Sequence, residues 1–225
     1  MFWLGDRPIE GVVLDLDGTL LDSMQVWSQI DEEFLGRRGL SVPADYGEAI
    51  VSLGFRATAE YTIQRFGLSE TPEQLMEEWS QMAAWKYHHE VALKPGAFSL
   101  LSAFHQRNIP MIAATALNPS LALPCLARHG VDGWLRGLVT VDQVGEGKAR
   151  PAIWLEAARQ LALPAERCLA LDDVAEALSG ARQAGMLAVG VPDPCSSSRQ
   201  ALEQAACLVA ENLEQLAGML VFPQD

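Results

Sequence analysis

Short runs of consecutive apolar residues recur along the chain and predict buried strands. The first run, at 11–16, reads GVVLDL and is apolar on successive positions, as expected for a strand covered on both faces. Similar runs follow at 109–114, 135–141, 168–171 and 187–191. Between the later runs, helical periodicity occupies 120–129, 151–161 and 174–184. Strands that alternate with helices predict an α/β fold built on a doubly wound parallel sheet.

The first two predicted strands are too far apart for a simple βαβ unit, which takes about 30 residues. A helix at 97–106 fills part of the gap, and the rest, 24–91, has almost wholly helical character. Thr71 followed by Pro72 is typical of a helix start. We therefore expect a core domain of residues 1–22 and 93–225, interrupted by a helical domain of residues 23–92, with hinges near 21–23 and 94–96.

Composition narrows the classes of partner. The 225 residues include 16 Lys and Arg against 29 Asp and Glu, a net charge of −13 that disfavours nucleic acid and anionic membranes. No apolar run approaches the roughly 18 residues that span a bilayer, and the first ten residues lack the pattern of a signal peptide. The four cysteines form no CxxC pair. We expect a cytoplasmic protein with reduced thiols and a monomer, although no pattern determines the oligomeric state.

Two carboxylates follow the first predicted strand. Asp15 and Asp17 are two residues apart on an extended segment, so both point to the same side, at the end of the sheet where α/β proteins bind ligands. Such close carboxylates repel each other unless a cation or a proton separates them. The alternative is that Asp17 and Gly18 only close a turn.

A second acidic pair, Asp172 and Asp173, follows the predicted strand at 168–171. Carboxylates without nearby His or Cys favour a hard cation such as Mg²⁺. Asp173 has the alternative role of capping the helix that follows.

Two further positions suggest an anion site. Thr115 ends the predicted strand at 109–114, and its hydroxyl and the backbone N–H of Ala116 precede a helix. Lys148 lies in the polar, glycine-rich loop GEGKARP. Alone it would be a solvated charge, but a phosphate that approaches two aspartates needs cations beside it.

The segments VVLDLDGTLLDS and LDDVAEALSGARQAGM, with Thr115 and Lys148 between them, resemble the four motifs of the haloacid dehalogenase-like (HAD) superfamily. The helical insertion resembles the cap of its β-phosphoglucomutase-like branch. The resemblance implies a Rossmann-like core with Asp15 as nucleophile and Asp17 as general acid and then base. It also implies Mg²⁺ held by Asp15, the Asp17 carbonyl and Asp173, with Asp172 as a direct or water-mediated ligand. The phosphate would lie on Thr115, Ala116 and Lys148.

The chain also departs from the pattern of this superfamily. Asp172 and Val174 stand where many relatives have Glu and Ser, and Ala152 stands where Asp is usual. Trp27 occupies the position of a cap histidine in the mutase, which favours hydrolysis over phosphoryl transfer between sugar hydroxyls. Asp17, the second acid, disfavours dehalogenation.

We therefore predict a Mg²⁺-dependent phosphatase that acts through an aspartyl-phosphate on a small phosphorylated metabolite, a sugar or polyol phosphate. The alternatives are a β-phosphoglucomutase-like mutase and a non-catalytic phosphate-binding protein. Arg56 and Trp27 are candidate substrate contacts in the cap, and Arg56 is alternatively a surface charge. We expect Lys86, His88 and His89 to be solvated, and the indoles of Trp79 and Trp85 to lie in the cap core.

Overall fold

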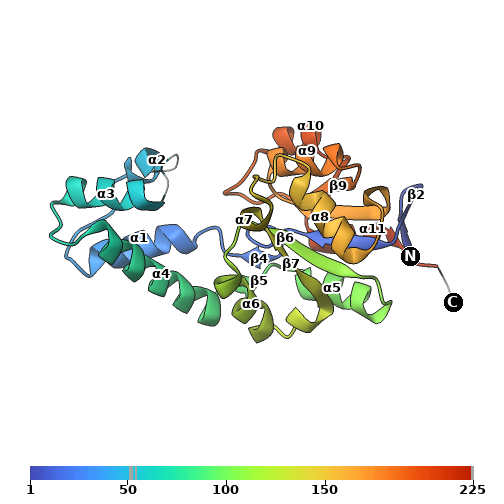
Figure 1. Cartoon of the computed structure of the whole chain (residues 1–225), viewed down its shortest axis with the longest axis horizontal. Helices are drawn as coiled ribbons and strands as arrows, with labels where there is room; N and C mark the ends of the chain where they lie inside the picture. Colours follow the sequence, from blue (N-terminus) through green and yellow to red (C-terminus); the bar gives the residue numbers. More distant parts are fainter. Residues whose placement is uncertain (51–52, 54, 224–225) are drawn as a thin grey trace. The chain divides into compact units, whose positions relative to one another are not determined.

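The computed structural model describes residues 1–50, 53 and 55–223. The chain divides into two compact units, Met1–Met24 with Val91–Asp225, and Gln25–Glu90 (Figure 1). The second unit is four residues shorter than the expected domain at 23–92, because β4 (Leu21–Asp22) and β5 (Ala92–Leu93) pair with each other as antiparallel strands. This pairing keeps the entry to the insertion and the exit from it in the first unit.

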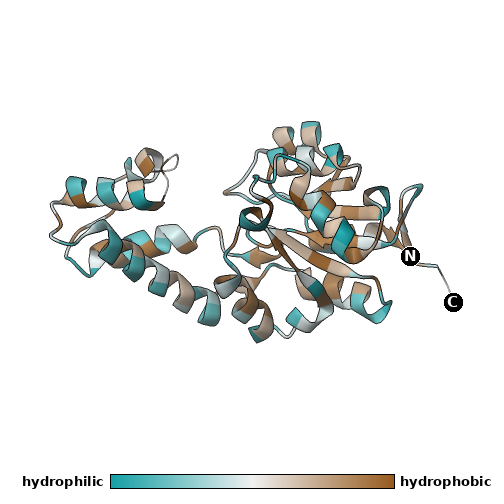
Figure 2. Cartoon of the chain, in the orientation of Figure 1, coloured by the Kyte–Doolittle hydropathy of each residue, from teal (hydrophilic) through white to brown (hydrophobic). Residues whose placement is uncertain are grey.

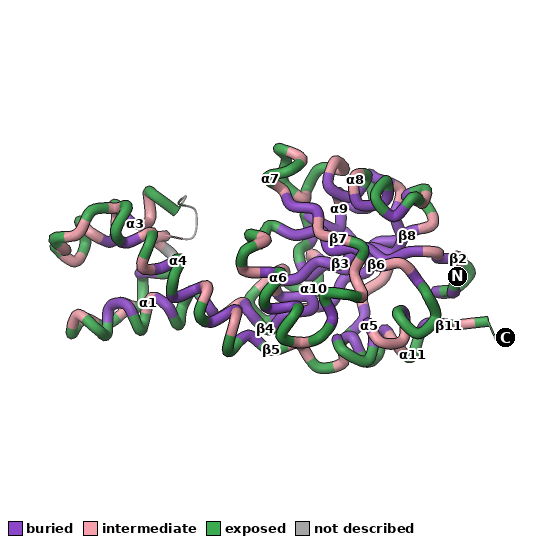
Figure 3. The backbone as a smooth tube through the Cα atoms, turned by 60° about the horizontal axis from the view of Figure 1, so that its bottom comes forward, coloured by how far each residue is buried: buried purple, intermediate pink, exposed green. Residues whose placement is uncertain are grey.

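Among the described residues of the first unit, six parallel strands form a sheet in the order β10-β9-β8-β3-β6-β7. Every neighbouring pair is parallel, which confirms the predicted doubly wound fold. The three central strands are buried throughout, as their unbroken apolar runs require (Figure 3). The strands are β3 (Gly11–Leu14), β6 (Met111–Thr115), β7 (Leu135–Thr140), β8 (Cys168–Asp172), β9 (Leu187–Gly190) and β10 (Leu208–Val209).

Helices cover both faces of this sheet. On one face, α8 contacts β3, β6 and β7, α9 contacts β8 and β9, and α10 packs on α9. Helices α5 and α6 lie on the other side of the sheet in Figure 1, and α11 packs on α5. The helices are α5 (Ala97–Gln106), α6 (Pro119–Arg128), α7 (Val141–Val144), α8 (Ala152–Leu161), α9 (Ala175–Gln183), α10 (Arg199–Ala205) and α11 (Leu213–Met219), with short 3-10 turns at Asp132–Trp134 and Ala165–Arg167.

The core lies between the sheet and the helices that cover it. The largest fully buried side chain is that of Trp154, on α8. The hydropathy colouring shows brown, apolar strands between helices that carry teal residues on their outer sides (Figure 2). Among the described residues, no helix combines the length and the apolar character that crossing a bilayer needs.

A small antiparallel sheet was not predicted. It pairs β1 (Phe2–Leu4) with β2 (Arg7–Ile9) and with β11 (Leu220–Val221), so the two ends of the chain lie side by side. Strands of two or three residues are too short to show a period of two in the sequence, which is why the pattern of apolar positions did not indicate them.

The inserted unit is helical, with α1 (Val26–Gly36), α2 (Tyr46–Ile50), α3 (Phe55–Phe66) and α4 (Pro72–His89). Thr71 caps α4 in a reciprocal arrangement with Gln74, which confirms the predicted helix start. Trp79 is buried as expected, and its ring packs on Phe34 with the centroids 5.4 Å apart.

Two predictions for α4 were wrong. The Trp85 side chain is 54% exposed, whereas Lys86, one residue later, is buried. The Lys86 ammonium lies 3.1 Å from Glu90 and 3.8 Å from Glu33 on α1. The rotation of the helix, and not the type of residue, decides which side chain faces the neighbouring helix, and a lysine buries its aliphatic stem readily when its charge finds partners.

Candidate active site

Neighbouring parallel strands end side by side, and this brings the predicted site residues together. Leu14 at the end of β3 is in register with Leu171 on β8 and with Ala113 on β6. Asp15 directly follows β3, Asp172 is the last residue of β8, and Thr115 is the last residue of β6. The carboxyl edge of the sheet therefore places an acid, a second acid and a hydroxyl on adjacent strands.

Lys148 reaches this edge from the loop between α7 and α8. Its Nζ lies 2.5 Å from Asp15 Oδ1 and 2.5 Å from Asp172 Oδ2. The ammonium therefore lies between two buried carboxylates. Because the side chain is only 13% exposed, it is not the solvated charge that a lone loop lysine would be.

Two residues that the sequence did not single out support Lys148. Trp154 Nε1 donates a hydrogen bond to the Lys148 carbonyl at 2.9 Å, and the Trp154 ring centre lies 5.5 Å from the Lys148 Nζ. Gly180 on α9 allows the loop to pack closely, since a Cβ at that position would lie 2.1 Å from the same carbonyl oxygen. An aromatic residue or a glycine inside a helix carries no local signal for such a role.

Asp173 faces the turn that follows Asp17. Its Oδ1 accepts a hydrogen bond from Thr19 Oγ1 at 2.9 Å, while its buried Oδ2 has no hydrogen-bond partner among the described residues. Gly18 adopts φ +79°, and a Cβ there would lie 2.4 Å from this Oδ2. Only glycine satisfies both the left-handed backbone and the close approach.

The alternative role of Asp173 as a helix cap was wrong. The carboxyl that accepts from the backbone at this turn is that of Asp172, whose Oδ1 takes the Val174 N–H at 2.8 Å. The Ala175 N–H donates to Ser197 Oγ at 2.9 Å. Asp173 Oδ2 is thereby left for another partner.

The three buried acids form a candidate cation site. Within the described part of the chain, Asp15, Asp172 and Asp173 each offer one oxygen, and these oxygens lie within 4.8 Å of one another. Their exposed fractions are 4%, 0% and 1%. Three buried carboxylates beside the Lys148 ammonium leave a net negative charge, which is costly in a buried site. This oxygen donor set and the unpartnered Asp173 Oδ2 fit a hard divalent cation.

Burial and the neighbouring charges shift the pKa values of all four side chains at the site. Burial raises the pKa of Asp15, and the Lys148 ammonium opposes the shift. Burial also raises the pKa values of Asp172 and Asp173, and the charge of Asp15 adds to both shifts. For Lys148, burial alone would lower the pKa, but the charges of Asp15 and Asp172 outweigh it and raise the pKa.

Asp17 and Thr115 have their own partners at the same edge. Asp17 is partly exposed, and its Oδ1 accepts a hydrogen bond from Ser23 Oγ at 2.6 Å. Thr115 is buried, and its Oγ1 accepts from the Leu117 N–H at 3.0 Å, which shapes the turn that contains the exposed Ala116. A threonine hydroxyl that accepts one hydrogen bond can still donate its own hydrogen, so Thr115 could donate to a bound anion.

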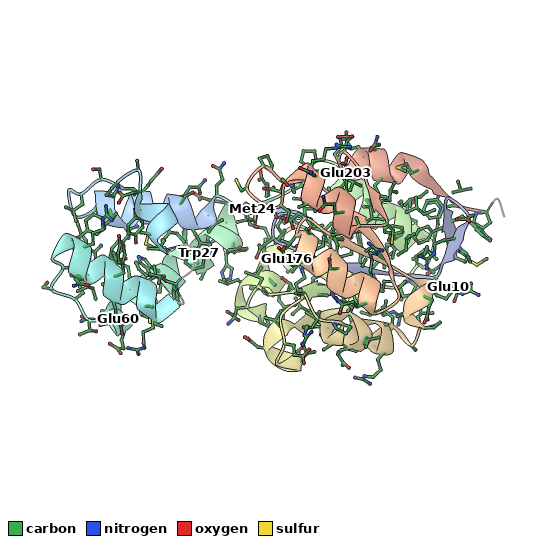
Figure 4. The ribbon with its side chains drawn as sticks, turned by 90° about the horizontal axis from the view of Figure 1, so that it is seen from above. Glu10, Met24, Trp27, Glu60, Glu176 and Glu203 are labelled. Atoms are coloured by element: carbon green, nitrogen blue, oxygen red, sulfur yellow. The ribbon has the colours of Figure 1, made fainter. Side chains whose placement is uncertain are left out.

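The candidate substrate contacts, Arg56 and Trp27, both belong to the inserted unit. Arg56 is exposed on α3 and its guanidinium lies 2.7 Å from Glu73. Trp27, which Figure 4 labels on α1, is 45% exposed. Its ring meets the Phe55 ring edge to face, with the centroids 5.8 Å apart. Their role toward a substrate stays a prediction.

A family model that covers most of the chain shows the family to which it belongs. The haloacid dehalogenase-like hydrolase model matches residues 9–185. The chain belongs to this family. It is therefore a hydrolase, and the resemblance of its motifs to this family is confirmed.

Relatives and solved structures agree with this membership. A Drosophila melanogaster protein named probable pseudouridine-5'-phosphatase is 28% identical over 200 residues, which cover 84% of each chain. Hexitol phosphatase A of Escherichia coli is 26% identical over 212 residues, covering 92% of this chain and 93% of the relative. A hydrolase of this family from Deinococcus radiodurans, solved with bound phosphate and sodium, shares the fold with a TM-score of 0.75 at 22% identity, covering 97% and 100% of the two chains. The phosphatase names agree with the predicted activity.

Proposed function

We propose that this haloacid dehalogenase-like hydrolase is a phosphatase that acts on a small sugar or polyol phosphate. The observation that carries the proposal is the buried Asp15 carboxylate held 2.5 Å from Lys148, beside two further buried acids. Relatives named as phosphatases of hexitol phosphates and of pseudouridine 5'-phosphate support this class of substrate.

The phosphate would bind where the carboxyl edge of the sheet offers positive charge and hydrogen-bond donors. Lys148 supplies the charge, and the Thr115 hydroxyl and the Ala116 backbone N–H supply donors ahead of α6. Because the chain carries a net charge of −13, this local concentration of donors is what would make an anion bind here.

Mg²⁺ is the cation that we propose for the acidic cluster, held by Asp15, Asp173 and the Asp17 carbonyl, with Asp172 as a direct or water-mediated ligand. Bound there, it would neutralise negative charge on the phosphate and the carboxylates. The unpartnered Asp173 Oδ2 supports this assignment.

The reaction would proceed in two displacements. An Asp15 oxygen attacks phosphorus, the bond from phosphorus to the substrate oxygen breaks, and Asp17 gives its proton to that leaving oxygen. Asp17, now a carboxylate, then takes a proton from water, whose oxygen attacks the aspartyl-phosphate. Inorganic phosphate leaves and the Asp15 carboxylate is restored. Lys148 holds Asp15 in place and balances negative charge throughout.

The inserted helical unit would act as a cap that selects the substrate. Its connections leave the first unit at Met24 and return at Val91, just beyond the paired strands β4 and β5, so we place the hinges there. Figure 4 labels Met24 at the first of these connections.

The experiment is a phosphomonoester panel, with hexitol phosphates and pseudouridine 5'-phosphate included, run with Mg²⁺ and with EDTA. We expect release of inorganic phosphate that disappears in Asp15→Asn and persists in Asp132→Asn, an exposed aspartate of the same unit used as the control. Equal phosphate release by wild type and Asp15→Asn, or none by wild type on any substrate, would overturn the proposal. Isomerised sugar phosphate without phosphate release would instead establish the mutase.

A further inference from the structure

Lys94 forms a buried link that the catalytic roles above do not use. It directly follows β5, and its Nζ lies 2.7 Å from the Gly18 carbonyl oxygen and 2.7 Å from Asp193 Oδ2. The side chains of Lys94 and Asp193 are 16% and 5% exposed. Neither position belongs to the motifs from which the family was predicted, and 99 residues separate the two in the sequence.

One end of this link holds the turn after Asp17. The Gly18 N–H donates to the Leu21 carbonyl at 3.1 Å, and the Gly18 carbonyl accepts from Lys94, so both sides of this left-handed residue are tied. The Lys94 N–H also donates to the Leu20 carbonyl at 2.8 Å. The turn that Lys94 holds is the one packed against Asp173 Oδ2.

The other end holds the segment that supports Asp173. Asp193 Oδ1 accepts the Cys195 N–H at 2.8 Å, which orders the loop after β9. From the same loop, Ser196 Oγ donates to the Asp173 carbonyl at 3.0 Å, and Ser197 Oγ accepts the first N–H of α9. Asp193 therefore belongs to the structure that sets the backbone of the second acidic pair.

We propose that Lys94 is a positioning residue that, with Asp193, clamps the turn after Asp17 to the loop behind Asp173. An ammonium suits this place because it donates to a carbonyl and a carboxylate at once, and charge-assisted hydrogen bonds are the stronger kind. The Asp17 backbone and carboxyl on one side and Asp173 on the other are thereby held in fixed relation. Lys94 acts through Gly18 and does not itself contact the reacting phosphate.

The position of Lys94 in the chain supports this role. The segment from Asp17 to Asp22 leads into the insertion. Lys94 directly follows β5, the strand by which the chain leaves the insertion and pairs with β4. The clamp therefore joins β5 to the turn after Asp17 within the first unit, so a shift of β5 would change the position of the Gly18 backbone.

The test compares Lys94→Met and Lys94→Arg with wild type. For Lys94→Met we expect kcat to fall on the order of ten- to a hundredfold with KM within about twofold, because a misplaced turn costs catalysis more than ground-state binding. We also expect faster hydrogen exchange of amides 15–22. Lys94→Arg keeps a donor for both acceptors and should recover part of kcat and of the exchange protection.

Two further variants isolate the clamp. Asp193→Asn should reproduce part of the loss, and Lys94→Met should add little in that background, because the two residues act as one link. Arg167→Met breaks the Arg167–Glu10 ion pair at the opposite ends of β3 and β8, and should leave kcat and the exchange of 15–22 unchanged. Fully additive losses in the double variant would overturn the clamp.

The inference rests on the proposed function for its kinetic part, and hydrogen exchange separates the two. If wild type hydrolyses no phosphomonoester, the proposed function fails, while faster exchange of 15–22 in Lys94→Met still supports the clamp. If wild type is active and Lys94→Met has wild-type kcat and wild-type exchange, the clamp is wrong and the proposed function stands.

Discussion

The two units of this protein handle their charged residues in opposite ways. In the inserted unit, Arg38 lies 2.7 Å from both Glu70 and Glu78, and the three side chains are 21%, 30% and 31% exposed, so water solvates the excess negative charge. In the first unit, Asp15, Asp172 and Asp173 are buried beside Lys148, and their negative charges exceed the contacting positive charge. Partly solvated ion pairs contribute little stability, whereas buried carboxylates without enough opposite charge cost stability and often mark a functional site. The burial of the excess negative charge therefore distinguishes the candidate active site from the solvated ion pairs of the inserted unit.

The largest expected effect contrasts Lys148 with Lys86, whose side chains are 13% and 9% exposed. Lys148→Met should lower kcat/KM on the order of 10²- to 10³-fold, because it removes the cation beside Asp15 and the phosphate. Lys86→Met should leave both catalytic constants unchanged and alter stability by no more than about 1 kcal/mol, because its partners Glu33 and Glu90 are well solvated. Steady-state kinetics and chemical denaturation of both variants check this. A loss of activity in Lys86→Met as large as that in Lys148→Met would erase the contrast between the units.

Glycines give the second contrast. Gly180→Ala should lower the free energy of unfolding by about 1–3 kcal/mol and reduce kcat, because the new Cβ would displace the Lys148 carbonyl. Gly36→Ala at the end of α1 meets nothing within 4 Å, so stability should be unchanged or rise by up to about 1 kcal/mol. Urea denaturation and kinetics measure both. Wild-type kcat in a stably folded Gly180→Ala would show that this close packing does not position Lys148.

The third prediction concerns pH and the one strongly shifted acid of the inserted unit's described helices. Burial raises the pKa of Asp31 on α1 to about 6. Burial also raises the pKa of Tyr46, and the charge of Asp31 adds to that shift. The folded state therefore holds the Asp31 proton up to higher pH than the unfolded state, and the stability it provides is lost as pH rises through about 6.

Asp31→Asn should accordingly raise the unfolding free energy at pH 7 by roughly 1–2 kcal/mol, and by much less near pH 4. Hydrogen exchange of the amides in 25–90, followed against urea concentration at the two pH values, measures the free energy of unfolding of this unit. Glu32→Gln, at an exposed neighbouring position, is the control. The same gain at both pH values would show that the Asp31 carboxyl is not what titrates.

The smallest expected effect is that of Arg56→Gln. Arg56 is exposed and paired with Glu73, so we expect no measurable change in melting temperature and a change in KM of less than about twofold. KM measured on the best substrate of the panel decides the point. A KM raised tenfold with kcat unchanged would restore Arg56 as a substrate contact and would give the inserted unit a functional charge of its own.

Local signals predicted much of the fold and several of the clustered acids. The run at 168–171 became β8, and the helix at 97–106 was predicted to the residue, because a buried strand and an amphipathic helix each leave a periodic pattern. Asp15, Lys148, Asp172 and Asp173 were predicted to meet, and they do, because parallel strands end at one edge. The rotation that exposes Trp85 and buries Lys86 was beyond such patterns, since it depends on where α1 packs.

By itself, then, the sequence determined the class of the fold, the insertion after the first strand and the identity of the acidic segments, all of which depend on residues close together in the chain. Only the tertiary structure decided the partners: Lys94 with Gly18 and Asp193, Trp154 with Lys148, and Asp173 Oδ2 left against Gly18. Contacts between residues so far apart arise when strands and loops are brought together by the burial of a common core, and no pattern within a single segment records which side chains will then be neighbours.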